Sequence, residues 1–267
     1  MAAPASDDRP VGFIDSGVGG LTILRAVRRL LPRESTLYAA DQAYFPYGDR
    51  PEAELRLRTE LLSRRLIERD AKLIVVACNA ASVGALAHLR ATFPATPFVG
   101  VVPVIKTLAR VTRTGVIGLL CTPSTARSPY IAMLADQFAA DQKLIVVECP
   151  SLANQLEFGE FSSPVTQALL HRLLQPLVAA GADAVGLGCT HYPLARRAIK
   201  RVLGPGVRVY EPSRPVARRV RQLLAEMSAL STQERPRHDF FTTGRPAQLQ
   251  AVLDKLRWLA GARAEKL

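Results

Sequence analysis

Two stretches of the sequence decide the fold: LIVVACNAAS at Leu73–Ser82 and AVGLGCTHYP at Ala184–Pro193. Each begins with a short apolar run, reaches a cysteine and continues into polar residues where a helix is expected to start. Near-continuous apolar runs of this length are typical of parallel strands that are buried on both faces. The two stretches therefore predict strands at residues 73–77 and 184–187, with Cys78 and Cys189 where the strands end.

The rest of the chain repeats this alternation of short apolar runs with longer amphipathic stretches. The short runs are mostly β-branched, and they predict further strands at residues 11–14, 36–40, 98–102, 115–120, 144–147, 207–210 and 240–243. The longer stretches predict helices at residues 51–69, 124–140, 164–180, 193–203 and, after a polar linker at 228–238, around 249–259. We expect Trp258 in this last helix to pack inward. Alternating strands and helices indicate an α/β fold with parallel sheets.

A faint internal repeat predicts two halves of similar build. The strand that ends at Ser16 matches the one that ends at Thr122, and Cys78 matches Cys189 at nearly the same separation along the chain. Ligands of parallel sheets bind beyond the carboxyl ends of the strands. We therefore expect two similar α/β domains with mainly parallel sheets flanked by helices, and an active site in the cleft between them. The alternative is that all parallel sheets repeat in this way. The expected domains are residues 1–104 plus 214–267 and residues 105–213.

The composition excludes several classes of protein. The 267 residues are 48% hydrophobic and 22% charged, which rules out wholesale disorder. No apolar run approaches the roughly 18–20 residues that a membrane helix needs, and residues 1–10 do not resemble a signal peptide. The four cysteines are widely spaced and include no CxxC pair, so we expect free thiols in a cytoplasmic protein rather than a disulfide framework.

The net charge of +12 leaves the partner open. Nine basic residues and one acidic residue, Glu211, lie between His191 and Arg221. Most of the basic residues are arginines, which hold phosphate and carboxylate groups in a bidentate manner. An acidic small substrate or a phosphate backbone could therefore be attracted. The alternative is a set of solvated helix faces, since net charge informs on solubility and encounter rather than on fold.

The glycine-rich segment DSGVGG, Asp15–Gly20, follows the first strand. Such a turn often binds phosphate at a helix N-terminus. Here the dinucleotide pattern would need a glycine at Thr22, and the Asp15 carboxylate would repel a pyrophosphate. A carboxylate at this place suits an ammonium group or a proton donor. The alternative is that Asp15 or Ser16 caps the following helix.

The two strand-end cysteines are candidate reactive thiols. A helix N-terminus lowers the pKa of a thiol beside it, although a lone cysteine there is as often an inert small hydrophobe. Cys121 and Cys149 lack this matched placement, and we interpret them as packing residues. His191 suits an acid, a base or a substrate contact beside Cys189. A Cys-x-His pair without further ligands predicts no metal site.

Two further segments contain candidate site residues, and for each of them a purely structural role is the alternative. Phe45–Gly48 forms a turn in which Tyr47 and backbone N–H groups could contact a carboxylate, or which only anchors a loop. Glu157 could reach the site, or it could be a solvated helix carboxylate.

Two thiols that face each other across one substrate suit a two-base exchange of a proton. One thiolate removes a proton from a carbon and the other thiol returns one to the opposite face, which inverts a stereocentre. No nicotinamide or metal motif and no strand-end lysine for pyridoxal phosphate accompany them, so we expect no cofactor. The α-proton of an amino acid is a very weak acid, so positioning, a dry site and donors aimed at the carboxylate must supply the catalysis.

Residues beside the strand ends could fill the supporting roles. Asp15 and either Glu157 or His191 would tune the thiols. Hydroxyl and backbone donors would hold the substrate, namely those of Ser16, Tyr47, Gly48, Asn79 and Thr190.

Four motifs together resemble one known family. FIDSGVGG (Phe13–Gly20), FPYG (Phe45–Gly48), ACNAAS (Ala77–Ser82) and GCTHYP (Gly188–Pro193) are similar to the motif set of glutamate racemases in the cofactor-independent aspartate/glutamate racemase superfamily. The resemblance runs from about Val11 to Ala225, and FFTTG (Phe240–Gly244) is similar to the family's C-terminal strand.

The resemblance implies a reaction and roles for named residues. It implies two α/β domains with the site between them, Cys189 as the base that acts on L-glutamate and Cys78 as the base that acts on D-glutamate. Asp15, Glu157 and His191 fall at the positions of assisting residues. The substrate-binding positions correspond to Asp15, Ser16, Tyr47, Gly48, Asn79, Ala80, Thr122, Thr190 and His191. Aspartate or another acidic amino acid stays open as the substrate.

The resemblance also implies a biological setting. D-glutamate would feed peptidoglycan synthesis and thereby the cell wall and cell shape. We expect a homodimer. Because some racemases of this family inhibit DNA gyrase, an arginine-rich surface that contacts gyrase or nucleic acid is a second hypothesis, compatible with the first.

The sequence departs from the family pattern at two places. The family has Asn-Thr after the first cysteine, whereas this chain has Asn79-Ala80. A backbone contact survives this change, but a hydroxyl contact does not, and a hydrogen bond to a charged group contributes about 1.5–3 kcal/mol. Arg245 follows the TTG stretch where family members can have an acidic residue.

Overall fold

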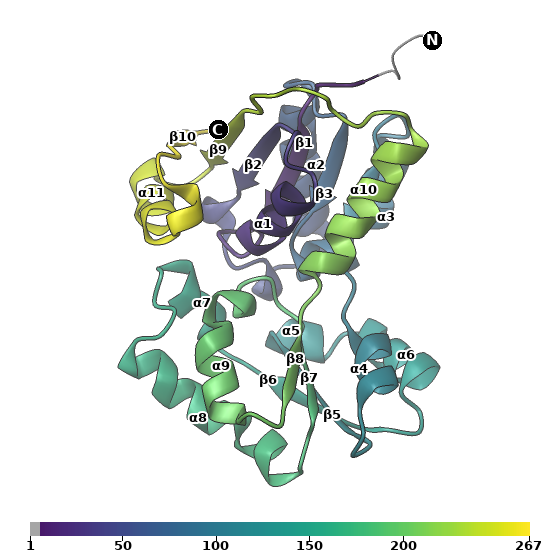
Figure 1. The fold of residues 1–267 in the computed structure, drawn as a ribbon, viewed down its shortest axis with the longest axis vertical. Helices are drawn as coiled ribbons and strands as arrows, with labels where there is room; N and C mark the ends of the chain where they lie inside the picture. Colours follow the sequence, from purple (N-terminus) through teal and green to yellow (C-terminus); the bar gives the residue numbers. More distant parts are fainter. Residues whose placement is uncertain (1–5) are drawn as a thin grey trace. The chain divides into compact units, whose positions relative to one another are not determined.

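The computed structural model describes residues 6–267; residues 1–5, the start of the segment in which we expect no signal peptide, lie outside this range. The chain forms two compact units (Figure 1). The first unit runs up to Val101 and resumes at Ser213–Leu267, and the second comprises Val102–Pro212.

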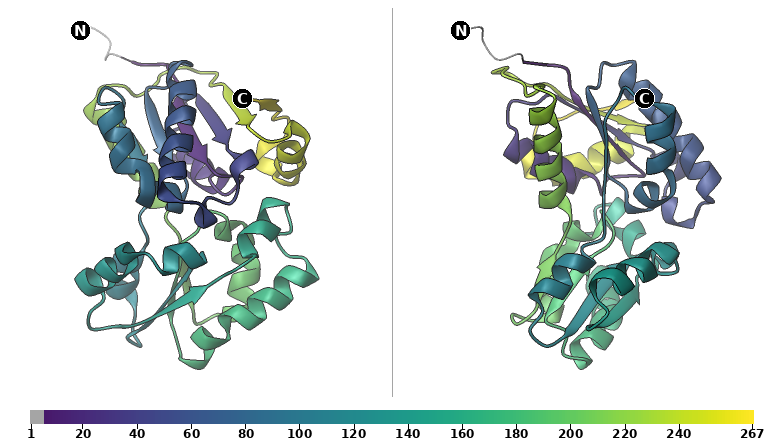
Figure 2. Two further views of the ribbon diagram at one scale, coloured as in Figure 1. Left: turned by 180° about the vertical axis from the view of Figure 1, so that it is seen from behind. Right: turned by 90° about the vertical axis from the view of Figure 1, so that its right-hand side faces the viewer.

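The first unit is a six-stranded parallel sheet with helices on both faces. The strand order is β10-β9-β2-β1-β3-β4. Helices α1 and α10 pack together on one face, and α2 and α3 pack together on the other (Figures 1 and 2). The elements are β1 (Val11–Asp15), α1 (Leu21–Leu30), β2 (Thr36–Ala40), η1 (Gln42–Tyr44), η2 (Tyr47–Asp49), α2 (Glu52–Ile67), β3 (Leu73–Val76), α3 (Asn79–Thr92), β4 (Phe98–Gly100), α10 (Ser213–Glu226), β9 (His238–Thr242), α11 (Pro246–Lys255), η4 (Arg257–Leu259) and β10 (Ala264–Lys266).

The second unit is a four-stranded parallel sheet in the order β6-β5-β7-β8. Helix α8 packs against α9, and α4 packs against α6. The elements are α4 (Ile105–Val111), β5 (Val116–Cys121), α5 (Pro123–Ala126), α6 (Pro129–Phe138), β6 (Lys143–Glu148), α7 (Leu152–Glu157), α8 (Pro164–Ala179), β7 (Ala184–Leu187), η3 (Tyr192–Ala195), α9 (Arg196–Leu203) and β8 (Arg208–Tyr210).

The predicted fold class is confirmed in both units. Every residue of β1, β2, β3 and β7 is buried, as the unbroken apolar runs indicate for strands covered on both faces. Two details differ from the prediction. The helix expected at 124–140 is two helices, because Ser128 Oγ accepts a hydrogen bond from the Tyr130 N–H and Pro129 begins a new first turn. Trp258 is only partly buried, and the guanidinium groups of Arg25 and Arg28 lie over its ring.

The strand orders identify where ligands would bind in each unit. From β1 the chain moves to β2 on one side and then to β3 on the other; from β5 it moves to β6 on one side and then to β7 on the other. Ligands of open parallel sheets bind at such switch points, beyond the carboxyl ends of the two strands. In the first unit Asp15 and Cys78 lie at this point, and in the second unit Thr122 and Cys189 do.

Candidate active site

The first group of candidate residues lies where β1 and β3 end. Asp15 is the last residue of β1, and Cys78 stands between β3 and the first residue of α3. Cys78 Sγ lies 3.9 Å from Ser16 Oγ. Both side chains are buried, so a reactive sulfur here would work in a nearly dry environment.

Asp15 is fully buried and shapes the turn that follows it. Its Oδ1 accepts a hydrogen bond from the Gly17 N–H at 2.8 Å, while Tyr38 Oη donates to the Gly17 carbonyl at 2.7 Å. Helix α1 begins after Gly20 without a side-chain cap, so the alternative that Asp15 or Ser16 caps this helix is wrong. A Cβ atom at Gly20 would lie 2.9 Å from the Ala77 Cβ and the Asp15 Cβ, so this glycine allows a close approach of the backbone.

Asn79 has a buried side-chain amide whose polar atoms are not satisfied by the described residues. It begins α3 and is 4% exposed, yet neither its Oδ1 nor its Nδ2 has a hydrogen-bond partner within residues 6–267. A buried amide without partners costs about 1–3 kcal/mol, so buried polar groups are nearly always satisfied. A polar ligand beside Cys78 would satisfy both atoms. Ala80, next to it, is partly buried against the core of this unit and offers no hydroxyl.

Tyr47 and Gly48 belong to the short helix η2. Tyr47 belongs to the same buried cluster as Cys78, and the Cys78 charge contributes, after burial and Asp41, to raising the pKa of Tyr47, so the two side chains are near enough to interact electrostatically. The Tyr47 hydroxyl donates to Asp41 Oδ2 at 2.6 Å, and burial, together with the Asp41 charge, raises the pKa of Tyr47 well above its ordinary value. The Tyr47 hydroxyl proton is therefore already donated to Asp41. The groups of this turn that suit a substrate carboxylate are the backbone N–H groups of Tyr47 and Gly48.

Asp41 and Arg58 form the network around Tyr47, and no motif in the sequence marks either residue as a site residue. Asp41 is fully buried and accepts two hydrogen bonds from the Arg58 guanidinium, at 2.8 and 2.9 Å. The sequence does contain one signal for Asp41: it follows β2 directly, as an acidic residue, Asp15, also ends β1.

The second group of candidate residues lies in the second unit, after β7. Cys189 Sγ lies 3.9 Å from His191 Nδ1, and His191 Nε2 lies 2.7 Å from Glu157 Oε2. Glu157 is the last residue of α7 and is 0% exposed, so the alternative of a solvated helix carboxylate is wrong. Burial lowers the pKa of His191, but hydrogen bonds to Cys189 and Glu157 raise it, and the net shift is well above the ordinary value. The raised pKa favours the cationic form of an imidazole that lies between a carboxylate and a sulfur.

Two threonines complete this group. Thr190 follows Cys189 and is buried. Thr122 caps α5, where its Oγ1 accepts from the Thr125 N–H and lies 2.9 Å from Thr125 Oγ1. Thr122 is partly exposed at the carboxyl end of β5, so its cap function and a substrate contact are compatible.

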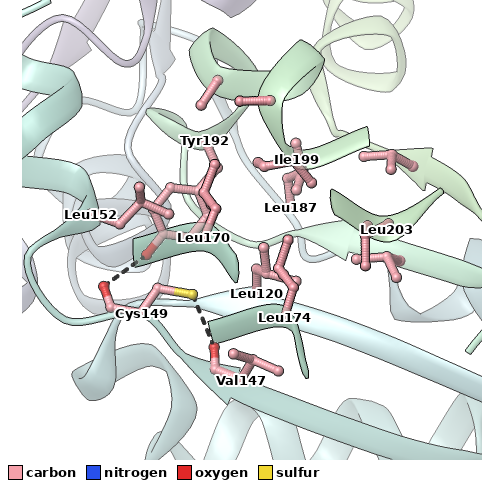
Figure 3. Close-up of a cluster of buried hydrophobic side chains, with 14 of the residues drawn as sticks. Leu120, Val147, Cys149, Leu152, Leu170, Leu174, Leu187, Tyr192, Ile199 and Leu203 are labelled. Carbon is pink, nitrogen blue, oxygen red and sulfur yellow. Dashed lines mark hydrogen bonds between the residues drawn. The ribbon is translucent and has the colours of Figure 1, made fainter. Parts of the chain in front are cut away.

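The remaining cysteines behave as packing residues. Burial raises the pKa of Cys121 to about 12 and also raises the pKa of Cys149. Cys149 Sγ donates to the Val147 carbonyl, and Tyr192 Oη donates to the Cys149 carbonyl, inside a cluster of leucines (Figure 3). Buried thiols of this kind are inert.

Residues 6–267 contain no group of three or more His, Cys, Asp or Glu side chains that could hold a metal ion. Within the same range, every helix is too short or too polar to cross a membrane.

Comparisons with known proteins agree on one family. The model of the Asp/Glu/Hydantoin racemase family matches residues 20–220. A glutamate racemase of Roseiflexus sp. (strain RS-1) is 48% identical over 218 residues, which cover 82% of this chain and 80% of that protein. A glutamate racemase of Ectopseudomonas mendocina (strain ymp) is 40% identical over 92% of this chain and 94% of its own. Among solved structures, Escherichia coli glutamate racemase in complex with L-glutamate and the activator UDP-MurNAc-Ala is similar with a TM-score of 0.88 and 34% identity, covering 97% of this chain and 98% of that one.

Proposed function

Because the chain belongs to the Asp/Glu/hydantoin racemase family, we propose that it interconverts L- and D-glutamate without a cofactor and uses Cys78 and Cys189 as its two bases. Glutamate is favoured over aspartate as the substrate by the relatives. Those that share 40–48% identity with this chain are named glutamate racemases, and the similar Escherichia coli structure contains L-glutamate.

The observation that carries the mechanism is the buried line of groups Cys189–His191–Glu157. A cationic imidazole beside the sulfur stabilises a thiolate, and the Glu157 carboxylate stabilises the imidazolium. This thiolate would remove the α-proton of L-glutamate. The Cys78 thiol, beside Ser16, would deliver a proton to the opposite face and yield D-glutamate. The reverse reaction exchanges the two roles.

The other site residues would bind the substrate and stabilise negative charge. Asn79 supplies an amide whose two polar atoms have no protein partner among the described residues. The Asp15 carboxylate suits the substrate ammonium group and the tuning of Cys78. Contacts to the carboxylates would come from Ser16, Thr122, Thr190 and the backbone of Tyr47, Gly48 and Ala80. The hydroxyl donors would act mainly by stabilising the charge that develops as the α-proton leaves, whereas the backbone donors of Tyr47 and Gly48 would hold a carboxylate in the ground state and the transition state alike.

Removal of either thiol tests the proposal. Cys78→Ala and Cys189→Ala should each abolish racemisation, because each removes the acid or base that the proposed mechanism assigns to one face of the substrate. Cys149→Ala is the matched control, since it deletes a buried thiol that lies in packing contacts. Full two-way activity in either of the first two variants would refute the two-thiol mechanism.

We place the reaction in the cytoplasm, where its D-glutamate would supply peptidoglycan synthesis and so cell-wall formation. The activator bound by the Escherichia coli relative supports this role, because its MurNAc sugar is a peptidoglycan building block. We also propose that the protein acts as a homodimer, which size-exclusion chromatography with light scattering would test.

A second candidate function is contact with nucleic acid or with DNA gyrase. Arg197, Lys200 and Arg201 are exposed on α9, a helix without an acidic residue. Phosphate contacts make affinity fall steeply with salt. DNA affinity should therefore fall steeply with salt in the unmodified chain and much less in an Arg197→Gln/Lys200→Gln/Arg201→Gln variant. Equal, flat slopes would remove the nucleic-acid hypothesis, and a pull-down with gyrase would address the protein partner.

A further inference from the structure

The buried carboxylate of Asp41 joins three separate segments of the first unit. Its Oδ1 accepts hydrogen bonds from Thr243 Oγ1 at 2.6 Å and from Arg58 Nη2 at 2.8 Å. Its Oδ2 accepts from Tyr47 Oη at 2.6 Å and from Arg58 Nε at 2.9 Å. Four donors from three side chains thus hold one carboxylate in a single orientation, with the Arg58 charge balancing it.

Thr243 bridges this carboxylate and the backbone that leads into the Phe45–Gly48 turn. Its Oγ1 donates to Asp41 and also accepts from the Ala43 N–H at 3.2 Å. Its own N–H donates to the Ala40 carbonyl at 3.0 Å. The stretch from Ala40 to Ala43 is therefore fastened to the end of β9, some two hundred residues later in the chain.

The same network reaches the reactive end of the sheet. Tyr47, the third donor side chain on Asp41, shares a buried cluster with Cys78. The Arg58 guanidinium also lies 3.7 Å from the centroid of the Tyr44 ring, just before the turn in sequence. A shift of the Asp41 carboxylate would consequently move the turn that carries Tyr47 and Gly48.

We propose that Thr243 is a positioning residue for glutamate binding: its hydroxyl orients Asp41, Asp41 holds Tyr47, and the backbone of Tyr47 and Gly48 is thereby placed beside Cys78. This inference rests on the proposed function, because it assigns glutamate to that backbone. It also gives the TTG stretch at the end of β9, Thr242–Gly244, a role that neither thiol explains.

The position of Thr243 predicts a particular kinetic signature. Backbone contacts to a substrate carboxylate act in the ground state and the transition state alike, so their loss raises KM and leaves kcat nearly unchanged. The hydrogen bonds of Thr243 go to Ala40, Asp41 and Ala43 rather than to a cysteine, so the proton transfers themselves should not slow.

The test compares Thr243→Val, which deletes the hydroxyl at nearly constant volume, with Thr243→Ser, which keeps it. The matched control is Thr36→Val: Thr36 pairs with His238 across the same two strands, β2 and β9, through a hydroxyl contact of 2.9 Å at their other end. We expect Thr243→Val to raise KM for both enantiomers about fivefold or more. Its kcat should stay within about twofold. Thr243→Ser should restore KM, and Thr36→Val should leave KM unchanged.

Two further measurements keep the outcome decisive. If Thr243→Val fails to fold, Tyr47→Phe should give the same rise in KM, because it breaks the next contact in the chain. Amide hydrogen exchange at residues 43–49 should accelerate in Thr243→Val but not in Thr36→Val. A KM for Thr243→Val equal to that of Thr36→Val, or a loss of kcat that serine does not rescue, would overturn the inference while the unmodified enzyme still racemises glutamate. An inactive unmodified protein would instead contradict the proposed function.

Discussion

His191 Nε2 lies 2.7 Å from Glu157 Oε2, and both side chains are almost completely buried in the second unit. The contact fixes the imidazole so that Nδ1 faces the Cys189 sulfur, 3.9 Å away. A carboxylate that orients a histidine, which in turn faces a nucleophilic or basic atom, is a recurrent arrangement in enzymes. In the proposed mechanism this arrangement would favour the thiolate form of Cys189, which acts as one of the two bases.

The negative charge of Glu157 should contribute more to kcat/KM than the shape of its side chain does. In Glu157→Gln the imidazolium loses its counter-charge in a buried place, so kcat/KM should fall about 100-fold. Because L- and D-glutamate have equal free energies in water, the fall must be the same in both directions. Circular dichroism of both reactions measures it. Glu160→Gln, at an exposed position three residues later, is the control. A Glu157→Gln enzyme with unmodified kcat/KM would show that the carboxylate plays no part.

We expect Ala80 to lower kcat/KM relative to a threonine at the same position. Ala80→Thr would place a hydroxyl beside Asn79, and a new hydrogen bond to a charged substrate group would add about 1.5–3 kcal/mol, or roughly 10- to 100-fold in kcat/KM. Ala80→Val adds the same volume without a donor and separates packing from hydrogen bonding. Equal kinetics for the two variants would mean that no hydroxyl contact exists at this position.

The four thiols should differ in reactivity. Cys121, with a pKa raised to about 12, and Cys149, also raised, should resist iodoacetamide at pH 8 in the folded protein, because alkylation needs the thiolate. We expect mass spectrometry to find label on Cys78 and Cys189, with loss of activity and with protection by glutamate. Labelling of Cys121 before either of these would contradict the assignment of packing and reactive thiols.

His238 should make stability depend on pH. Burial, with a contribution from Arg28, lowers its pKa to about 4 in the folded chain, against an unfolded value near 6.5. Between these values the unfolded chain binds a proton that the native chain lacks, so the free energy of unfolding falls as the pH drops from about 6.5 to about 4. Since the imidazole is half-buried and screened by solvent, we expect a loss of about 1–2 kcal/mol. Urea titrations at several pH values should show a smaller loss in His238→Gln; identical pH profiles would contradict the prediction.

The strands and the first group of site residues could be predicted because both follow from local pattern. Runs such as Leu73–Val76 are apolar throughout, and a polar residue directly after such a run lies at the ligand-binding edge of a parallel sheet. The break between α5 and α6 had a local signal too, the Ser128-Pro129 pair.

The burial of Glu157 and the function of Asp41 could not be predicted from local sequence pattern. Glu157 ends a short helix whose pattern is equally suited to solvent, and its contact with His191 comes from another part of the second unit. The function of Asp41 depends on Thr243 and Arg58, which are distant in sequence. Long-range contacts of this kind leave no periodicity in the chain.

The most direct test is the reaction of pure L-glutamate in deuterated water without added cofactor, with optical rotation and α-deuterium followed together. With separate bases on the two faces, a solvent-derived deuteron arrives from Cys78 while the original hydrogen leaves on Cys189. Early D-glutamate should therefore carry α-deuterium, while the remaining L-glutamate keeps its hydrogen. Early D-glutamate that retains hydrogen, or deuterium that enters both enantiomers at equal rates from the start, would contradict the two-thiol mechanism.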